Sequence, residues 1–485
     1  MKIAETVKVF NNTINKNLKY IYLFLVLPLI LFQVFFTPPF QTPDSPNNFN
    51  RAYQISNFKL IGSRMKNLSG GYINSNMISV ESIFNNIPFH YNNKVTEDQL
   101  VKAHSYKWHQ SNKSQTYTFA SFPNTSVYPP FAYLPQALAI KIGRLANLSI
   151  LDTYRLSLLS VSLLAVIFTY LALSLGSRLS TAIFVTATLP MVTCLYAAVE
   201  ADALLISAGF LLAAIIAKAI ESNSYRRRST IILFILITFL AIQKPSYIGL
   251  EFLFFIPGFS VSNSYSLLKR FFLASISSMI VISWIVYAKL VAWININPNH
   301  TSLISHIYFV LHNPYALITI FTRTLHSGYV NYYHQMVGVL GWLDTPLPNW
   351  YYIIVLAAFA LTVIMTSTKL RFTDWLFISL SISTTILMVF IALYADWSPV
   401  YAQVIEGVQG RYFLPILPLS FMIVAPITFY FVNATKIATG KINIIISKYM
   451  PQVKLLVMLL LYFLFPLITY VVTVDALISR YYLTI

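Results

Sequence analysis

Long apolar runs recur along the chain and are separated by shorter polar and basic segments. A run of roughly 17–25 apolar residues is long enough to cross the hydrocarbon core of a bilayer. Eleven runs approach this length, and we expect each of them to form a transmembrane helix. They cover about 20–37, 156–175, 180–198, 203–220, 230–243, 246–261, 271–292, 349–367, 375–394, 412–433 and 454–474.

Two neighbouring runs, 230–243 and 246–261, are short and flank Gln243-Lys244-Pro245. This pattern predicts a broken helix or a hairpin that crosses only half of the bilayer. Broken helices at membrane depth are tolerated where they line a cavity.

Composition supports the same class of protein. Of the 485 residues, 57% are hydrophobic and only 10% are charged, whereas a soluble domain carries about 25% charged residues. A soluble enzyme, a disordered chain and a fibrous repeat are therefore excluded. We predict an all-α polytopic membrane protein with about eleven transmembrane helices. Its single cysteine, Cys194, leaves no intramolecular disulfide to form.

The distribution of basic residues predicts the orientation. Lys and Arg outnumber Asp and Glu by 33 to 15, for a net charge of +18. Lys and Arg concentrate in cytoplasmic loops, and the excess also favours binding of anionic lipid. We expect a cytoplasmic N-terminus, a bacterial inner-membrane location and a periplasmic active face. The basic loops hold Arg178, Arg226-Arg227-Arg228, Lys269-Arg270, Lys369, Arg371, Lys436, Lys441 and Lys448.

This orientation divides the chain into five parts, and two long segments then lie outside the membrane. The first apolar run leads directly into Pro38-Pro39 without a small-residue cleavage site, so we expect a retained first span. The parts are 1–37, the cytoplasmic N-terminus and first span; 38–155, an extracytoplasmic loop subdomain with an interfacial helix at 128–145; 156–292, spans two to seven; 293–348, a second extracytoplasmic segment; and 349–485, spans eight to eleven and an outer C-terminus.

Candidate chemistry falls on the outer face. The short cytoplasmic loops carry no P-loop and no dinucleotide-binding glycine motif. An enzyme of this layout needs a substrate that has already been carried across the membrane, such as a polyprenyl-linked sugar. Histidine spacing gives no typical zinc pattern, and we expect neither a metal nor another cofactor.

Asp44 is the candidate catalytic residue. The prolines of Pro38–Pro46 stiffen the chain where it leaves the first span and hold Asp44 near the outer interface. A carboxylate there could deprotonate a hydroxyl acceptor, and Arg51 could bind a phosphate. The alternatives are that Asp44 caps the following helix and that Arg51 extends to lipid head-groups.

Two further cations are candidate ligands for a lipid phosphate. Lys244 lies between two apolar runs on the outer side, and Arg411 lies at a membrane edge beside Gly410, with Gln409 and Tyr412 as neighbours. Arginine beside glycine can approach a phosphate closely. The alternative for Arg411 is an ion pair that fixes the loop.

Five acidic residues on the outer side are further site candidates, because ionisable groups at a membrane edge are functional candidates by default. Solvated helix caps and turn residues are the alternatives. For Asp344, in the turn-like sequence LDTPLP, an Asx-turn is the favoured interpretation. The five are Glu200, Asp202, Asp344, Asp396 and Glu406.

Four segments together resemble a known family. PPFQTPD followed by RAYQ, YPPFAYLPQALAIKIGRL, VGVLGWLDTPLP and GVQGRYFLPILP look like the signatures of the membrane-protein family called domain of unknown function 2142, in the family's order. That family resembles the GT-C glycosyltransferases, which are polytopic, use polyprenyl-linked sugars and carry an acidic motif in the first outer loop. The layout is also similar to the phage-type glucosyltransferases that convert O-antigen serotype.

The resemblance implies a metal-independent inverting glycosyltransferase. The family's first-loop motif reads Pro-Asp-Glu followed by histidine, whereas this chain has Pro43-Asp44-Ser45-Pro46. The missing second carboxylate removes a typical metal ligand, so cations would neutralise the phosphate. The expected donor is a polyprenyl-phosphate-linked sugar, with glucose favoured, and the expected acceptor is a surface polysaccharide such as O-antigen. Flippase and donor-synthase partners are expected, and nucleic acid is not.

Three rival functions remain at this stage. One is an O-antigen polymerase, which shares the topology but has its large outer loops late in the chain. A transporter or flippase for a lipid-linked glycan would carry charges at mid-membrane, where Glu251 is one acidic residue deep in an apolar run. A non-catalytic assembly protein of envelope synthesis would tolerate loss of Asp44.

Overall fold

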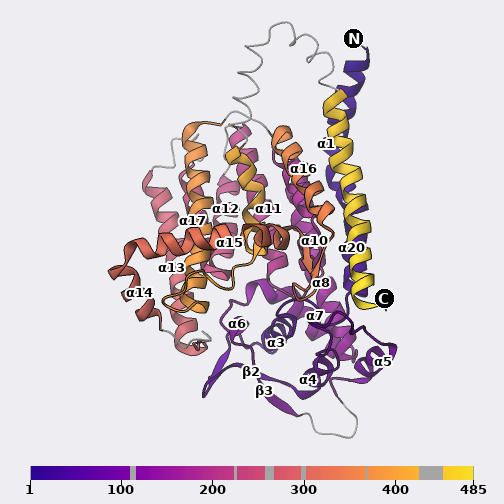
Figure 1. Cartoon of the computed structure of the whole chain (residues 1–485), viewed down its shortest axis with the longest axis vertical. Helices are drawn as coiled ribbons and strands as arrows, with labels where there is room; N and C mark the ends of the chain where they lie inside the picture. The colour runs from indigo at the N-terminus through magenta and orange to yellow at the C-terminus, as the bar shows by residue number, and fades with distance from the viewer. Residues whose placement is uncertain are drawn as a thin grey trace.

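The computed structural model describes residues 2–109, 116–222, 227–256, 267–295, 302–366, 370–424, 426 and 452–483. Long helices lie side by side in a bundle, and a small subdomain with strands covers one end of it (Figure 1). The C-terminus lies at the subdomain end, and the N-terminus lies at the other. Lys369, Lys436, Lys441, Lys448 and Arg226, which enter the predicted orientation, fall outside the described residues.

Among the residues that the structure describes, seven helices are long and apolar enough to cross a membrane, or eight if one bent pair is a single span. An all-α polytopic membrane protein is therefore confirmed, whereas the expected number of eleven spans is not. The seven are Lys16–Phe36, formed by α1 (Lys2–Leu25) and α2 (Leu27–Phe36); α8 (Ile150–Ser174); α11 (Asp202–Ser222); α13 (Leu267–Val291); α16 (Asn349–Thr366); α17 (Phe372–Trp397); and Gln452–Tyr481, which includes the π-helical turn η5 (Leu460–Leu464) and α20 (Phe465–Tyr481).

Prolines explain why other apolar runs do not form full spans. The run 180–198 is divided into α9 (Ser180–Thr188) and α10 (Pro190–Tyr196), because Leu189 before the proline is extended. Pro245 likewise ends α12 (Arg227–Gln243) and begins the 3₁₀-helix η2 (Pro245–Phe255). The predicted break at Gln243-Lys244-Pro245 is thus present. The run 412–433 is described as far as residue 424 and at 426; it begins in η4 (Gly410–Ile416), and Gly410–Val424 is a shorter apolar helix than the seven spans.

The segment 293–348, expected outside the membrane, contains two helices. α14 (Leu303–His312) and α15 (Pro314–Gly338) are bent by 106° relative to each other and together are apolar enough for a span. Figure 1 shows α15 running across the bundle at a steep angle to the long helices. The short strands β4 (Val339–Leu340) and β5 (Thr345–Pro346) follow and pair antiparallel.

Residues 38–109 and 116–149 form the loop subdomain that covers one end of the bundle (Figure 1). Its antiparallel sheet has the order β1-β2-β3, with Tyr72 opposite Phe119 in the register. The elements are α3 (Ser45–Ser56), β1 (Ser63–Met65), β2 (Leu68–Asn74), α4 (Ser75–Ser82), α5 (Glu97–Ser105), β3 (Tyr117–Ser121), α6 (Pro123–Ser126), η1 (Phe131–Tyr133) and α7 (Leu134–Leu145).

The predicted interfacial helix corresponds to α7, which has two different faces. One face is buried through Ala137, Ile140 and Gly143, and it packs against α3 and α8. Leu138 and Leu145 on the other face are 61% and 76% exposed. An exposed apolar face on a helix at the end of a membrane bundle is typical of an interfacial helix. Contact with a lipid leaflet stays a prediction.

Candidate functional site

Five charged side chains converge where the loop subdomain meets the membrane helices, and we call them the charged cluster. Asp44 precedes α3, Glu200 lies between α10 and α11, Asp202 begins α11, Lys244 separates α12 from η2, and Arg411 lies in η4. The cluster therefore joins the first loop to the ends of several membrane helices. All five residues were individual candidates from the sequence.

Arg411 is the centre of this cluster and is only 5% exposed. Its Nη1 lies 2.8 Å from Glu200 Oε2 and 3.9 Å from Asp202 Oδ2, and its Nη2 lies 3.7 Å from Asp44 Oδ2. Its Nε donates a hydrogen bond to Gln409 Oε1 at 2.7 Å. A single guanidinium thus lies within 4 Å of three carboxylates, and its contacts with Asp44 and Asp202 are both looser than its contact with Glu200.

Lys244 forms the second ion pair of the cluster. Its Nζ lies 2.5 Å from Asp202 Oδ1 and 4.7 Å from the centre of the Tyr412 ring. The Tyr247 hydroxyl donates to the Tyr412 carbonyl at 2.9 Å and fixes that segment. Gln409 and Tyr412 therefore support the two cations, in agreement with their grouping in the sequence analysis.

Asp44 is the most accessible member, with a side chain that is 43% exposed. It occupies the N-cap position of α3 in a left-handed conformation, with φ of 58°, but its side chain makes no capping hydrogen bond. The helix-cap alternative therefore does not describe this carboxylate. Asn124 Nδ2 donates to Asp44 Oδ1 at 2.8 Å instead.

Asn124 was not a candidate from the sequence, because an asparagine in a polar loop carries no distinguishing signal. It belongs to the short helix α6, and its own amide is oriented by a second contact: Asn47 Nδ2 donates to Asn124 Oδ1 at 2.8 Å. The Thr125 hydroxyl donates to the Asn47 carbonyl at 3.0 Å. The loop subdomain therefore fixes one oxygen of Asp44, and the other faces Arg411.

Glu200 is buried, and its surroundings oppose charge. Burial raises the pKa of its carboxyl to about 8, although Arg411 opposes this rise. Oε2 contacts Arg411, whereas the buried Oε1 has no hydrogen-bond partner in the described part of the chain. Burial and the Arg411 guanidinium therefore act on the pKa of Glu200 in opposite directions.

Gly410 serves packing rather than access to a ligand. A Cβ at this position would lie 1.8 Å from the Tyr332 carbonyl oxygen of α15. The Gly410 amide also donates to Gln335 Oε1 at 3.0 Å. The glycine beside Arg411 thus lets η4 approach the backbone of α15.

Arg51 lies in α3 and is fully buried. Its guanidinium donates to Gln54 Oε1 at 2.5 Å and to the carbonyls of Leu60 and Tyr128 at 2.6 and 2.7 Å. Burial lowers its pKa to about 10. These contacts give Arg51 a structural role within the loop subdomain, and it is not exposed to head-groups as the alternative interpretation expected.

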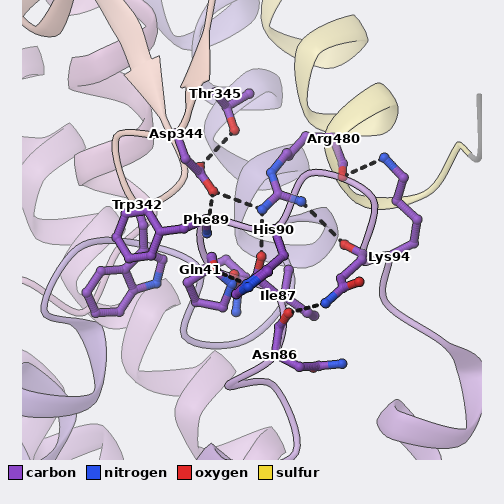
Figure 2. A network of polar contacts seen from close by, with 12 residues as sticks. Gln41, Asn86, Ile87, Phe89, His90, Lys94, Trp342, Asp344, Thr345 and Arg480 are labelled. Atoms are coloured by element: carbon purple, nitrogen blue, oxygen red, sulfur yellow. Dashed lines mark hydrogen bonds and ion pairs between the residues drawn. The ribbon is translucent and has the colours of Figure 1, made fainter.

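Asp344 belongs to a separate network, shown in Figure 2, rather than to the charged cluster. Asp344 Oδ2 lies 2.8 Å from Arg480 Nη2 and accepts a hydrogen bond from the Phe89 amide at 3.0 Å. Arg480 is fully buried and also donates to the Ile87 carbonyl at 2.7 Å. This network ties the end of α20 to the loop subdomain, and Lys94 adds bonds to the carbonyls of Ser479 and Arg480.

Asp396 and Glu406, the remaining acidic candidates, are exposed. Asp396 lies near the end of α17, and the Glu406 amide donates to the Ser398 hydroxyl at 3.0 Å. Within the described residues, no ion pair joins either of them to the charged cluster. The same residues contain no group of three or more His, Cys, Asp or Glu side chains that could hold a metal ion.

Comparison with known proteins gives a family. The sequence model of a family described as predicted membrane protein, domain of unknown function 2142, matches residues 27–420. The chain belongs to this family. The match to domain of unknown function 2142 includes the whole charged cluster and Asn124, whereas Arg480 lies beyond it. No curated protein and no solved structure matches the chain.

Proposed function

We propose that this protein is an inverting glycosyltransferase that moves a hexose from a polyprenyl-phosphate carrier to a surface polysaccharide on the outer side of a bacterial inner membrane. The observation that carries the proposal is the placement of Asp44. Its carboxylate is 43% exposed, is fixed by Asn124 and faces Arg411, in the cluster that also holds Lys244. Glucose and O-antigen are the sugar and the acceptor that the family resemblance favours.

Asp44 acts as the general base in this proposal. It accepts the proton of an acceptor hydroxyl as that oxygen attacks the anomeric carbon of the donor sugar. The bond between the anomeric carbon and the phosphate oxygen breaks on the opposite face, which inverts the configuration. Polyprenyl phosphate leaves with the bonding electron pair, and no general acid is required because phosphate is a good leaving group.

Lys244 and Arg411 stabilise the charge on the departing phosphate. Each cation is paired with a buried carboxylate, but neither is saturated. Lys244 uses one of its three donors on Asp202, and within the described part of the chain Arg411 Nη2 makes only the 3.7 Å contact with Asp44. Fixed donors aimed at developing charge are effective because they need no reorganisation during the reaction. Asp202 and Glu200 hold these cations in place.

Substitution of Asp44 tests the proposal. Asp44→Asn keeps the size of the side chain and removes the base, so glycan transfer should fall by about 10²–10⁴-fold. The measurement is mass spectrometry of surface polysaccharide from cells that express each variant, with an immunoblot for protein abundance. Wild-type cells should show a mass increase of one hexose per modified unit.

Asp98→Asn is the matched control, because Asp98 is an exposed carboxylate of α5 in the same subdomain. It should leave the modification intact. Normal modification by Asp44→Asn at normal abundance would overturn the base assignment. Loss of all exported glycan on gene deletion, instead of loss of one hexose, would favour the transporter or assembly alternatives.

A further inference from the structure

Glu251 is a buried acidic residue that the proposed reaction does not use. It lies in η2, an 11-residue 3₁₀-helix that packs against α12, α13 and α17. Its side chain is about nine-tenths buried, and the Ser278 hydroxyl of α13 lies 2.6 Å from Glu251 Oε2. Oε1 is buried and has no hydrogen-bond partner among the described residues.

The position of Ser278 gives the depth of this carboxyl group. α13 has 25 residues from Leu267 to Val291, and Ser278 lies close to its midpoint. A helix of this length spans the bilayer, so its midpoint lies near the centre of the hydrocarbon core. The neighbouring Ser277 is fully buried and accepts a hydrogen bond from the Thr238 hydroxyl of α12 at 3.1 Å. Neutral hydroxyls therefore surround Glu251 at mid-membrane.

Charged groups on the surrounding helices lie toward the helix ends. α13 carries its basic residues near its two ends, and Arg270 Nη1 donates to the Phe255 carbonyl. Arg270 is eight positions from Ser278, roughly 12 Å along the helix. In the described ranges, Glu251 makes no ion pair. The charged or titratable groups on these elements are Lys269, Arg270, Tyr287 and Lys289 of α13, Asp374, Tyr394 and Asp396 of α17, Arg227 and Arg228 of α12, and Lys244 and Tyr247 at the start of η2.

We propose that Glu251 is a proton-binding site inside the membrane bundle and carries its proton at neutral pH. An unpaired carboxylate at the bilayer centre is strongly disfavoured, whereas the uncharged acid is tolerated. As an acid, Glu251 can exchange hydrogen bonds with the hydroxyl of Ser278. The inference does not depend on the proposed glycosyltransferase activity.

A protonated carboxyl in an apolar environment should react with a hydrophobic carbodiimide such as dicyclohexylcarbodiimide. The carboxyl proton moves to a carbodiimide nitrogen, and the carboxyl oxygen bonds to the central carbon to give an O-acylisourea. The acyl group then shifts to nitrogen and yields a stable N-acylurea. No group leaves, so the protein gains the mass of one reagent molecule.

The test uses the full chain in native membranes, treated with dicyclohexylcarbodiimide at pH 7 and analysed by peptide mass spectrometry. The peptide that contains Glu251 should gain one reagent mass, and Glu251→Gln should abolish this adduct. Glu221 is the matched control, because it pairs with Arg178 and Lys218 and should remain unlabelled. A water-soluble carbodiimide should label Glu251 at least tenfold less.

Two results would overturn the proposal. One is the absence of a Glu251 adduct at pH 7 together with its appearance at pH 5, which would mean that the carboxyl is ionised at neutral pH. The other is equal labelling by the hydrophobic and the water-soluble reagent, which would mean that Glu251 faces water. Because the wild-type chain is labelled, neither result depends on the folding of a variant.

Discussion

Asn124 Nδ2 donates a hydrogen bond of 2.8 Å to Asp44 Oδ1, although the two residues are 80 positions apart in the chain. The bond fixes the carboxylate of the proposed base from the side of the loop subdomain. It leaves Oδ2 toward Arg411. Asn124 is therefore a positioning residue for Asp44.

The first prediction concerns this pair. Asn124→Ala should lower the turnover number by about 10–100-fold, because a hydrogen bond to a charged group is worth roughly 1.5–3 kcal/mol. The KM for the lipid-linked donor should change little, since the cations remain. The measurement is transfer of a labelled sugar by purified protein over a range of donor concentrations.

Asn47→Ala is the control for this experiment, because Asn47 contacts Asn124 rather than Asp44. It should have a smaller effect on turnover. Equal losses in the two variants, or a change confined to KM, would contradict a positioning role for Asn124.

The second prediction concerns the buried pair of Arg411 and Glu200, whose side chains are 5% and 4% exposed. Above about pH 8, where Glu200 is ionised, Arg411→Met alone leaves Glu200 without its cation and should lower stability by about 3–5 kcal/mol, the usual cost of breaking a buried pair. Arg411→Met combined with Glu200→Gln should recover part of that loss. Thermal unfolding in detergent measures both, and an additive decrease in the double variant would exclude coupling.

The third prediction is a pH dependence of stability. Burial raises the pKa of Glu200 from its ordinary value of 4.5 to about 8, so between these values the folded protein holds a proton that the unfolded chain releases. The contribution of the Glu200 proton to the free energy of unfolding is therefore fully present below about pH 4.5 and is lost as the pH rises to about 8. Glu200→Gln should flatten this part of the profile.

The single cysteine provides the measurement for this pH profile. Cys194 is buried, so a thiol-reactive dye reports its exposure on unfolding. The midpoint temperature of unfolding should fall by a few degrees between pH 5 and pH 8 in the wild type. In a chain of about 150–250 residues a change of 1 kcal/mol shifts the midpoint by roughly 2–4 °C, and the shift is smaller in a larger chain. An unchanged slope in Glu200→Gln would assign the pH dependence to other groups.

The fourth prediction concerns orientation. Lys102 of α5 and Arg178 before α9 are exposed at opposite ends of the bundle in the predicted topology. In intact spheroplasts, an impermeant thiol reagent should label Lys102→Cys and spare Arg178→Cys, while buried Cys194 gives no background. The reverse pattern would invert the topology, and Arg178→Cys in opened membranes provides the positive control.

The apolar pattern predicted most of the membrane helices because a span requires an uninterrupted apolar length. The pattern predicted too many spans where a proline divides an apolar run, as at Leu189-Pro190, because the hydropathy of a run carries no information on a break in the backbone helix. It missed α14 and α15, because Arg323, His326 and His334 make the 25-residue α15 resemble a polar segment. The orientation of α15 across the bundle depends on tertiary packing.

The charged cluster was predictable residue by residue but not as a unit. Asp44, Lys244 and Arg411 are each predicted as site candidates because a charged side chain at a membrane edge is costly. Their convergence depends on how six segments pack, which no spacing rule contains. Arg51 illustrates the limit in the other direction: a buried arginine that binds carbonyls has the same sequence signature as one that binds phosphate.

The contact between Asp344 and Arg480 has a consequence for the order of assembly during synthesis. α20 follows every other described element along the chain, yet Arg480 donates to the carbonyls of Ile87 and Asn93 in the loop subdomain. The Val95 amide likewise donates to the Tyr481 carbonyl. The loop subdomain is translated before α20, so it can form these hydrogen bonds only after α20 has been synthesised. We therefore expect the carbonyls of Ile87 and Asn93 to lack the donor that Arg480 supplies until α20 has packed against the loop subdomain.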